Sequence, residues 1–434
     1  MKKIFQSVGP ALIVAAVVLG PGSILTSSKV GATLGVMGFP IVAGAAVLMI
    51  AMVALSARLG AFYEKSLCEE LSDRLGRPVS VLIGTILFIL VALFQSSNNI
   101  ALIAGLEPML GDSPLTFEVR AGILVGCNLL VIAILYLMRD LYRFIETGMK
   151  ILIGLMIVAF LINFVVVMVK PRSFVPSEST TDLDWLALMG MIGTTFSVGG
   201  AFYQAYLVKE KGWGIKDVRK GTVDSIVSIS ILGGVTAIIL LSSWRVFYGQ
   251  PGGVQFSNVG DVARQLEPSF GKSATVIFCT GILAGGLSSF LVNALIGGTV
   301  MADSIGKGAR LSDRWPVHMT TLALLVGMAV GIASLFNDKS TVHLITVAQA
   351  CTVIGIPALA AALIFLAVQP EILKAKIVPP LVLLLAIVGF FVSYELAKIT
   401  SAKVYRKLNP VVGIDSAKTG VPNLLANSKN ESSE

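Results

Sequence analysis

The chain has 434 residues, of which 55% are hydrophobic and only 13% are charged, and its mean hydropathy is +0.86. This composition is typical of a polytopic membrane protein and argues against a soluble enzyme. The formal net charge is +8, but the basic residues lie mostly in short segments between apolar runs, which favours a role in membrane topology over nucleic-acid binding.

Long apolar runs alternate with short polar segments along most of the chain. A helix needs roughly 17–25 mostly apolar residues to cross a bilayer, and eleven runs meet this condition. We therefore predict an all-α membrane protein with about eleven transmembrane helices. The runs are 10–34, 37–57, 79–106, 119–138, 149–169, 185–208, 222–243, 273–301, 317–336, 341–368 and 378–399.

The first run contains Gly20-Pro21-Gly22-Ser23 near its centre, four residues that disfavour a continuous helix. An unwound backbone at membrane depth leaves amides and carbonyls unpaired unless protein, water or a bound solute satisfies them. This break therefore predicts a binding site. The alternative is that its glycines only permit close helix packing.

A second break, Ser197-Val198-Gly199-Gly200, lies at the centre of the sixth run, directly after Thr194, Thr195 and Phe196. Interrupted spans at equivalent positions of two halves are typical of secondary transporters built from inverted repeats, whose substrate binds near the midplane between the broken helices. We therefore predict a LeuT-type five-plus-five arrangement with broken helices 1 and 6. Its expected divisions are 1–170 (spans 1–5), 171–370 (spans 6–10), 371–402 (span 11) and 403–434 (a polar tail).

The distribution of Lys and Arg predicts the orientation. More than half of the 33 basic residues fall in short segments on the inner side when the N-terminus is cytoplasmic, as the positive-inside rule requires. We expect a multi-pass protein of the cytoplasmic membrane with a cytoplasmic N-terminus.

Neutral polar groups gather on the spans expected around the breaks. Gly20 and Thr194 can offer carbonyls, and Ser23, Ser197 and Gln349 can contact a solute directly or through water. Interhelical hydrogen bonding is the alternative for each lone polar residue. The expected pathway lining comprises Gln95 and Asn98 of the run Gln95-Ser96-Ser97-Asn98-Asn99 with Gly199 and Gly200, and span eight adds Ser288, Ser289 and Asn293 as further polar candidates.

The central parts of spans one, three, six and ten contain no Asp, Glu, Lys, Arg or His. Proton-coupled transport usually needs a titratable group in the pathway, and a dehydrated dication normally needs carboxylate ligands. The sequence therefore favours an ion that keeps much of its water shell, or a solute held by dipoles.

Four motifs give the chain a resemblance to a known family, and they extend over most of the spans. They are Ala57-Arg58-Leu59-Gly60, Gln204-Ala205-Tyr206-Leu207-Val208, the stretch from Gly281 to Ser289, and Ala348-Gln349. On these residues the chain resembles the NRAMP (natural resistance-associated macrophage protein) divalent metal transporters. The resemblance implies a five-plus-five inverted-repeat transporter with eleven or twelve spans.

The departures from this family fall at the expected site. Its Asp-Pro-Gly-Asn motif is replaced by Gly20-Pro21-Gly22-Ser23, and its Met-Pro-His by Ser197-Val198-Gly199. Gln95 and Asn98 stand where it has an acidic pair associated with proton movement, whereas Gln349 matches its metal-facing glutamine. This pattern resembles the NRAMP-related magnesium transporter branch, in which a widened site is thought to accept a mostly hydrated Mg²⁺ without proton coupling.

Together these observations predict a secondary transporter that moves Mg²⁺, and also Mn²⁺, by alternating access without proton coupling. The predicted ion ligands, direct or through water, are Gly20, Ser23, Thr194, Ser197 and Gln349. We expect no enzymatic activity, no cofactor besides the transported ion, and no nucleic-acid partner; the oligomeric state stays open. Two alternatives remain: a carrier of a small organic anion or amino acid on the same fold, and a non-transporting receptor or scaffold.

Overall fold

A computed structural model describes residues 9–110, 115–138, 140–170, 185–250, 256, 260–263, 271–336 and 338–408; the side chains of Leu186, 338–352 and 403–408 are outside this description. Every regular element in the described part is a helix, which confirms the all-α prediction. The elements are α2 (Pro10–Val18), α3 (Pro21–Leu34), η1 (Gly35–Met37), α4 (Gly38–Phe62), α5 (Leu67–Leu75), α6 (Arg77–Leu110), α7 (Phe117–Leu137), α8 (Leu141–Val169), α9 (Trp185–Thr195), α10 (Val198–Glu210), η2 (Ile215–Asp217), α11 (Val218–Phe247), α13 (Lys272–Ser304), α14 (Arg314–Ser334), α15 (Asp338–Ala367), α16 (Pro370–Lys374) and α17 (Pro380–Leu408).

Each predicted run coincides with one long helix or with a pair of half-helices. The first run forms α2 and α3, and the sixth forms α9 and α10, so both predicted breaks exist. By length and composition, eight described helical segments can each cross a membrane, one of which runs through α3, η1 and α4. The half-helices α9 and α10, of 11 and 13 residues, are each too short to span alone. The predicted tail begins later than expected, because α17 continues to Leu408, and residues 409–434 lie outside the described part.

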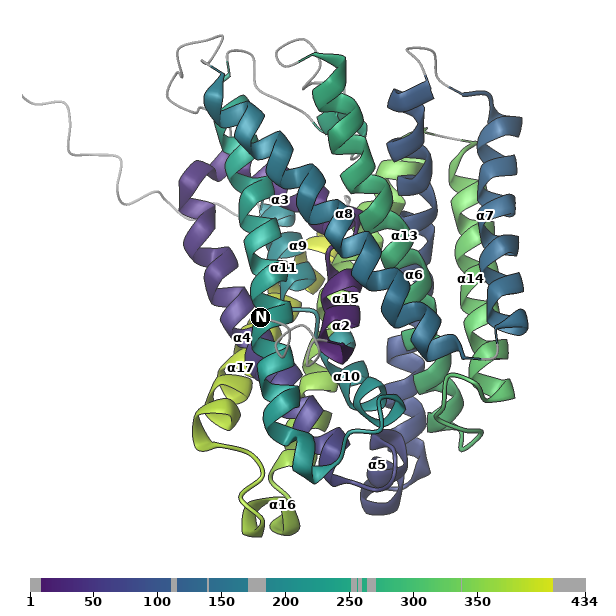
Figure 1. Cartoon of the computed structure of the whole chain (residues 1–434), viewed down its shortest axis with the longest axis vertical. Helices are drawn as coiled ribbons and strands as arrows, with labels where there is room; N and C mark the ends of the chain where they lie inside the picture. Colours follow the sequence, from purple (N-terminus) through teal and green to yellow (C-terminus); the bar gives the residue numbers. More distant parts are fainter. Residues whose placement is uncertain are drawn as a thin grey trace, which may run out of the picture.

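The broken helices lie at the centre of the bundle. In Figure 1, α2 and α10 lie between the longer helices, with α7 and α14 along one edge and α4 and α17 along the other. Small residues allow the close packing: a Cβ at Gly298 of α13 would lie 2.3 Å from the backbone nitrogen of Thr320 in α14. Such close approach is typical of membrane helices, which gain little hydrophobic free energy by associating in lipid.

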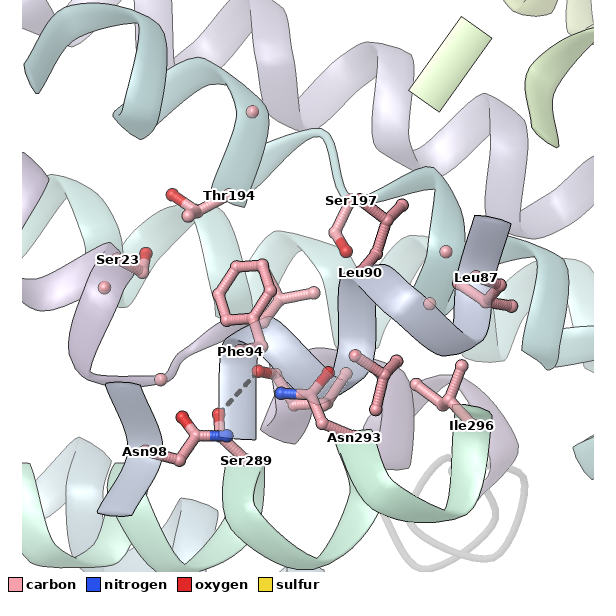
Figure 2. A pocket seen from close by; sticks show the side chains of 18 of the residues that line it. Ser23, Leu87, Leu90, Phe94, Asn98, Thr194, Ser197, Ser289, Asn293 and Ile296 are labelled. Atoms are coloured by element: carbon pink, nitrogen blue, oxygen red, sulfur yellow. Dashed lines mark hydrogen bonds between the residues drawn. The ribbon is translucent and has the colours of Figure 1, made fainter. Parts of the chain in front are cut away.

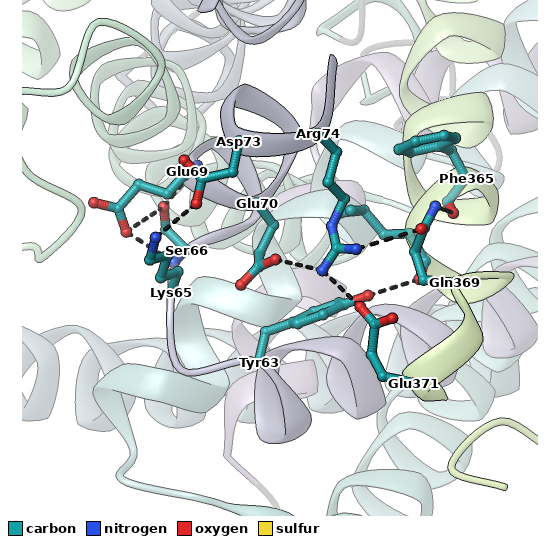
Figure 3. Close-up of polar contacts among 11 residues, drawn as sticks. Tyr63, Lys65, Ser66, Glu69, Glu70, Asp73, Arg74, Phe365, Gln369 and Glu371 are labelled. Atoms are coloured by element: carbon teal, nitrogen blue, oxygen red, sulfur yellow. Dashed lines mark hydrogen bonds and ion pairs between the residues drawn. The ribbon is translucent and has the colours of Figure 1, made fainter. Parts of the chain in front are cut away.

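A polar cluster joins α5 to the segment around α16 at the predicted cytoplasmic end (Figure 3). The Arg74 guanidinium pairs with Glu70 at 2.8 Å and with Glu371 at 2.6 Å. It also lies 5.3 Å from the ring centroid of Tyr63, whose hydroxyl donates to the Leu366 carbonyl at 2.9 Å. These contacts connect α5 and the segment after α4 to the end of α15 and to α16.

Candidate functional site

The first break is shorter than the sequence suggested. Helix α2 ends at Val18 and α3 begins at Pro21, so only Leu19 and Gly20 lie between them. Pro21 occupies the first position of α3, where its fixed φ suits a helix and its missing N–H costs nothing. The amides of Gly22 and Ser23 therefore belong to a first helical turn, in which N–H groups have no intrahelical acceptor.

The second break follows the same plan. Helix α9 ends at Thr195 and α10 begins at Val198, which leaves Phe196 and Ser197 as the connection. Ser197 is the N-cap residue, and its side chain makes no capping hydrogen bond. Gly199 and Gly200, predicted to be unwound, form the first turn of α10 instead.

One cavity lies between the two breaks (Figure 2). Its volume is about 40 Å³, and it is bounded by α2, α3, α6, α9, α10, α13 and α15. None of the described residues that line it is ionisable, as expected for the centres of these spans. The lining residues are Val17, Val18, Gly20, Pro21, Gly22, Ser23, Leu87, Leu90, Val91, Phe94, Asn98, Gly193, Thr194, Ser197, Gly199, Gly200, Ser289, Asn293, Ile296, Ile356 and Leu359.

Seven of the nine predicted site and pathway residues line this cavity. They are Gly20, Ser23, Asn98, Thr194, Ser197, Gly199 and Gly200. Gln95 lies behind the wall, and the side chain of Gln349, in α15, is outside the described part. Ser289 and Asn293, two of the further polar candidates on span eight, also line the cavity, whereas Phe94 was not predicted.

The oxygens of the predicted ligands differ in what they can still bind. The Ser23 hydroxyl is buried and has no hydrogen-bond partner among the described residues, so it is available to a solute. The Thr194 hydroxyl donates to the Gly190 carbonyl at 2.8 Å, and its oxygen keeps lone pairs that can still accept. The Gly20 carbonyl accepts from the amide of Ile24 at 3.1 Å and keeps one lone pair.

Two serines of α13 bind the carbonyls that α2 leaves open. The Ser288 hydroxyl donates to the Ala16 carbonyl at 2.9 Å, and the Ser289 hydroxyl donates to the Val17 carbonyl at 2.6 Å. The Ser289 hydroxyl also occupies the space beside Gly20, because a Cβ there would lie 2.3 Å from the Ser289 Oγ. Glycine is thus required at position 20 by its neighbour.

A chain of amides runs from the cavity wall into α6 and α7. Asn98 donates from its side-chain nitrogen to the Gln95 Oε1 at 2.8 Å, and Gln95 donates to the Phe290 carbonyl at 2.8 Å. Asn128 continues the chain by donating to the Asn99 Oδ1 at 2.7 Å. Since the nitrogen of Asn98 is engaged, its carbonyl oxygen is the group that it can offer to the cavity. No member of this chain titrates.

A family model for natural resistance-associated macrophage protein-like (Nramp) proteins matches residues 11–401. The chain belongs to the Nramp family. This Nramp protein is 24% identical over 368 residues to a Listeria welshimeri protein named divalent metal cation transporter MntH, a match that covers 80% of this chain and 78% of the relative.

Solved structures confirm the LeuT-type fold. The crystal structure of the Eremococcus coleocola manganese transporter matches 95% of this chain and 89% of its own, with a TM-score of 0.75 and 17% identity. MhsT in complex with L-phenylalanine matches 90% of this chain and 98% of its own, with a TM-score of 0.55 and 14% identity. The Listeria relative and the Eremococcus protein are both named transporters, and membership of the Nramp family agrees with the expectation of a transporter and not an enzyme.

Proposed function

We propose that this Nramp protein moves Mg²⁺, and also Mn²⁺, across the cytoplasmic membrane by alternating access, without proton coupling and with its N-terminus in the cytoplasm. The observation that carries the proposal is the cavity between the two breaks, which offers neutral oxygens from Ser23, Thr194, Ser197 and Asn98 and no described ionisable side chain. Relatives named divalent metal cation transporters support the class of substrate.

The physical argument rests on hydration. Mg²⁺ dehydrates reluctantly and usually retains several waters in proteins, so neutral oxygens around the cavity can hydrogen-bond the waters that it keeps without supplying the carboxylates that a bare dication needs. No methionine lines the described cavity, and a thioether is the ligand that would favour soft transition metals. We therefore expect weak discrimination between Mg²⁺ and Mn²⁺.

The absence of proton coupling rests on the amide chain. Gln95, Asn98, Asn99 and Asn128 fill the place of a proton relay with groups that neither gain nor lose protons at physiological pH. The ion could then cross the cavity without a proton moving along the amide chain.

Uptake into proteoliposomes tests the proposal directly. Mg²⁺ and Mn²⁺ should enter with saturable kinetics, and the interior should not acidify beyond the level in protein-free liposomes. Ser23→Ala should weaken Mg²⁺ uptake, whereas Ser27→Ala should not: Ser27 lies one turn later on α3, with an equally buried and unpartnered hydroxyl, but does not line the cavity. Mg²⁺-driven acidification, or equal effects of the two substitutions, would contradict the proposal.

A second candidate function is transport of a small organic anion or amino acid. It is favoured by the N-termini of α3 and α10, which begin at Pro21 and Val198 beside the cavity, because free amides and the helix dipole attract a carboxylate. Competition in the uptake assay separates the candidates: inhibition of Mg²⁺ uptake by Mn²⁺ supports the cation, and saturable amino-acid uptake unaffected by Mg²⁺ supports the anion.

A further inference from the structure

Helix α7 is the least buried of the eight described spans and lies beside α14 at one edge of the bundle (Figure 1). Polar contacts fasten its two ends. At the predicted outer end, Arg120 pairs with Glu107 of α6 at 2.6 Å. At the predicted cytoplasmic end, the Tyr136 hydroxyl lies 2.8 Å from the Nδ1 of His318 in α14. This second contact is exposed, so its surroundings are the headgroups of the lipid and not the protein interior.

The contact between Tyr136 and His318 belongs to a row of exposed side chains from α7, α14 and the segment before α14. The His318 ring meets the Trp315 ring edge-on, with 6.3 Å between their centroids, and the Lys307 Nζ lies 5.7 Å from the Trp315 centroid. Arg314 is exposed and precedes His318 by four residues, so it lies one turn away on the same face of α14. We call Tyr136, Lys307, Arg314, Trp315 and His318 the inner-edge patch.

The inner-edge patch offers hydrogen-bond donors and positive charge. When the Tyr136 hydroxyl donates to the Nδ1 of His318, the Nε2 of the neutral ring carries the hydrogen, and a protonated ring carries one there as well. Lys307 and Arg314 add two cations, neither of which has an ion-pair partner in the described part of the chain. The adjacent acid, Asp313, accepts from the backbone amide of residue 310 at 3.0 Å. The patch is therefore suited to a phosphate group.

The surface that continues from the patch toward the bilayer centre is apolar. On α14, the exposed Leu322 and Leu325 lie four and seven residues after His318, and on α7 the exposed Leu129 lies seven residues before Tyr136. These spacings place the leucines on the same helix faces as the patch. Acyl chains can cover such a surface while the phosphate meets the cations, as at other membrane interfaces. A soluble phosphate compound would leave the apolar surface uncovered.

We propose that the inner-edge patch binds the phosphate of an anionic phospholipid in the leaflet at the predicted cytoplasmic side. The Nε2 of His318 donates to a phosphate oxygen, and Lys307 and Arg314 compensate the negative charge. Because His318 is also in contact with Tyr136, the bound lipid fastens the weakly buried α7 to α14. An ordinary aromatic belt would accept any phospholipid, whereas this patch selects a headgroup with net negative charge. The site is independent of which solute the protein transports.

Trp315 lies in the patch and can report its occupant. A variant with Trp315 as its only tryptophan, and phenylalanine at the other three positions, is reconstituted in phosphatidylcholine bilayers. A fraction of the lipid is replaced by phosphatidylglycerol or phosphatidylcholine with brominated acyl chains, which quench a nearby indole. We expect brominated phosphatidylglycerol to bind at Trp315 about fivefold or more tightly than brominated phosphatidylcholine. The matched control keeps only Trp185, which is 52% exposed against 42% for Trp315 but lies at the predicted outer end, and should show no preference.

Removal of single charges assigns the preference to the patch. Arg314→Gln and Lys307→Gln should each lower the preference for phosphatidylglycerol about fivefold. Lys374→Gln removes the same charge from an exposed position on α16, away from α7 and α14, and should change nothing. Equal quenching of Trp315 by the two lipids, or equal losses from Arg314→Gln and Lys374→Gln, would overturn the proposal in favour of an ordinary aromatic belt.

Thermal unfolding of protein with all its tryptophans gives a second test if the single-tryptophan variants do not fold. In detergent micelles, added phosphatidylglycerol should raise the unfolding temperature more than phosphatidylcholine does, because a ligand that binds only the folded state stabilises it. His318→Phe keeps a ring against Trp315 but removes the donor, and it should abolish this excess. An unchanged excess in His318→Phe would overturn the role of His318. An equal rise with glycerol 3-phosphate would assign the patch to a soluble phosphate and overturn the lipid site.

Discussion

Replacing Gly20 by alanine should destabilise the protein through Ser289 and not through the backbone. The backbone at Gly20, with φ −81° and ψ 179°, is open to any residue, so the change introduces no conformational strain. The new Cβ, however, would lie 2.3 Å from the Ser289 Oγ and 3.0 Å from its Cβ. The hydroxyl must then move away from the Val17 carbonyl, and a buried carbonyl left without its donor costs about 1–3 kcal/mol.

A double-mutant cycle isolates this effect. Ser289→Ala alone removes the same hydrogen bond and the oxygen that the new methyl would meet at 2.3 Å, leaving only the 3.0 Å contact with the Cβ, so Gly20→Ala should cost less in that background, with a coupling of about 1–2 kcal/mol. Denaturant unfolding in detergent micelles, followed by circular dichroism, gives the four stabilities. Gly122→Ala of α7, where a Cβ meets nothing within 4 Å, is the control and should be neutral. Additive losses from Gly20→Ala and Ser289→Ala would refute the reasoning.

Two further substitutions test groups behind and outside the cavity. Gln95→Leu leaves the Phe290 carbonyl and the Asn98 amide unpaired, which should lower the stability by about 2–5 kcal/mol; an unchanged unfolding midpoint would contradict the amide chain. The pKa of Glu371 lies below its usual 4.5, first through its own backbone amide and then through Arg74. Its contribution is therefore complete above pH 4.5 and is lost as pH falls through the folded-state pKa, so Glu371→Gln should lower the thermal midpoint slightly at about pH 7 and should have progressively less effect as the pH falls below 4.5.

The sequence predicts this fold well because a bilayer leaves the backbone few choices. Apolar length identifies each span, and Pro21 together with the paired glycines identifies both breaks. The extent of unwinding could not be foreseen, since Pro, Gly and Ser also suit the first turn of a helix. Gly22 and Gly199 are therefore expected to be unwound from the sequence, but they lie in the first turns of α3 and α10.

The site could be predicted only as far as its residues are unusual for a membrane span. Ser23, Ser197 and Asn98 are polar at central positions, and all three line the cavity. Gln95 is equally polar but supports Asn98 from behind, because which face of α6 meets α13 depends on packing that a single sequence does not specify. Phe94 gave no signal, since an aromatic residue is ordinary in an apolar span.

Gly20 and Ser289 are best understood as one feature. Where the family has an aspartate, this chain has a glycine, and the volume that a side chain at position 20 would need is taken by a hydroxyl that closes the end of α2. A carboxylate at position 20 would need the space that the Ser289 hydroxyl fills, and this hydroxyl holds the end of α2 at the break. A substitution that restores the acid at Gly20 alone would displace Ser289 and leave the Val17 carbonyl open in the cavity wall, so it would change the shape of the site before it supplied a ligand. The packing of α2 against α13 thus leaves no space for an acid at position 20, which is consistent with the proposed binding of an ion through its own water.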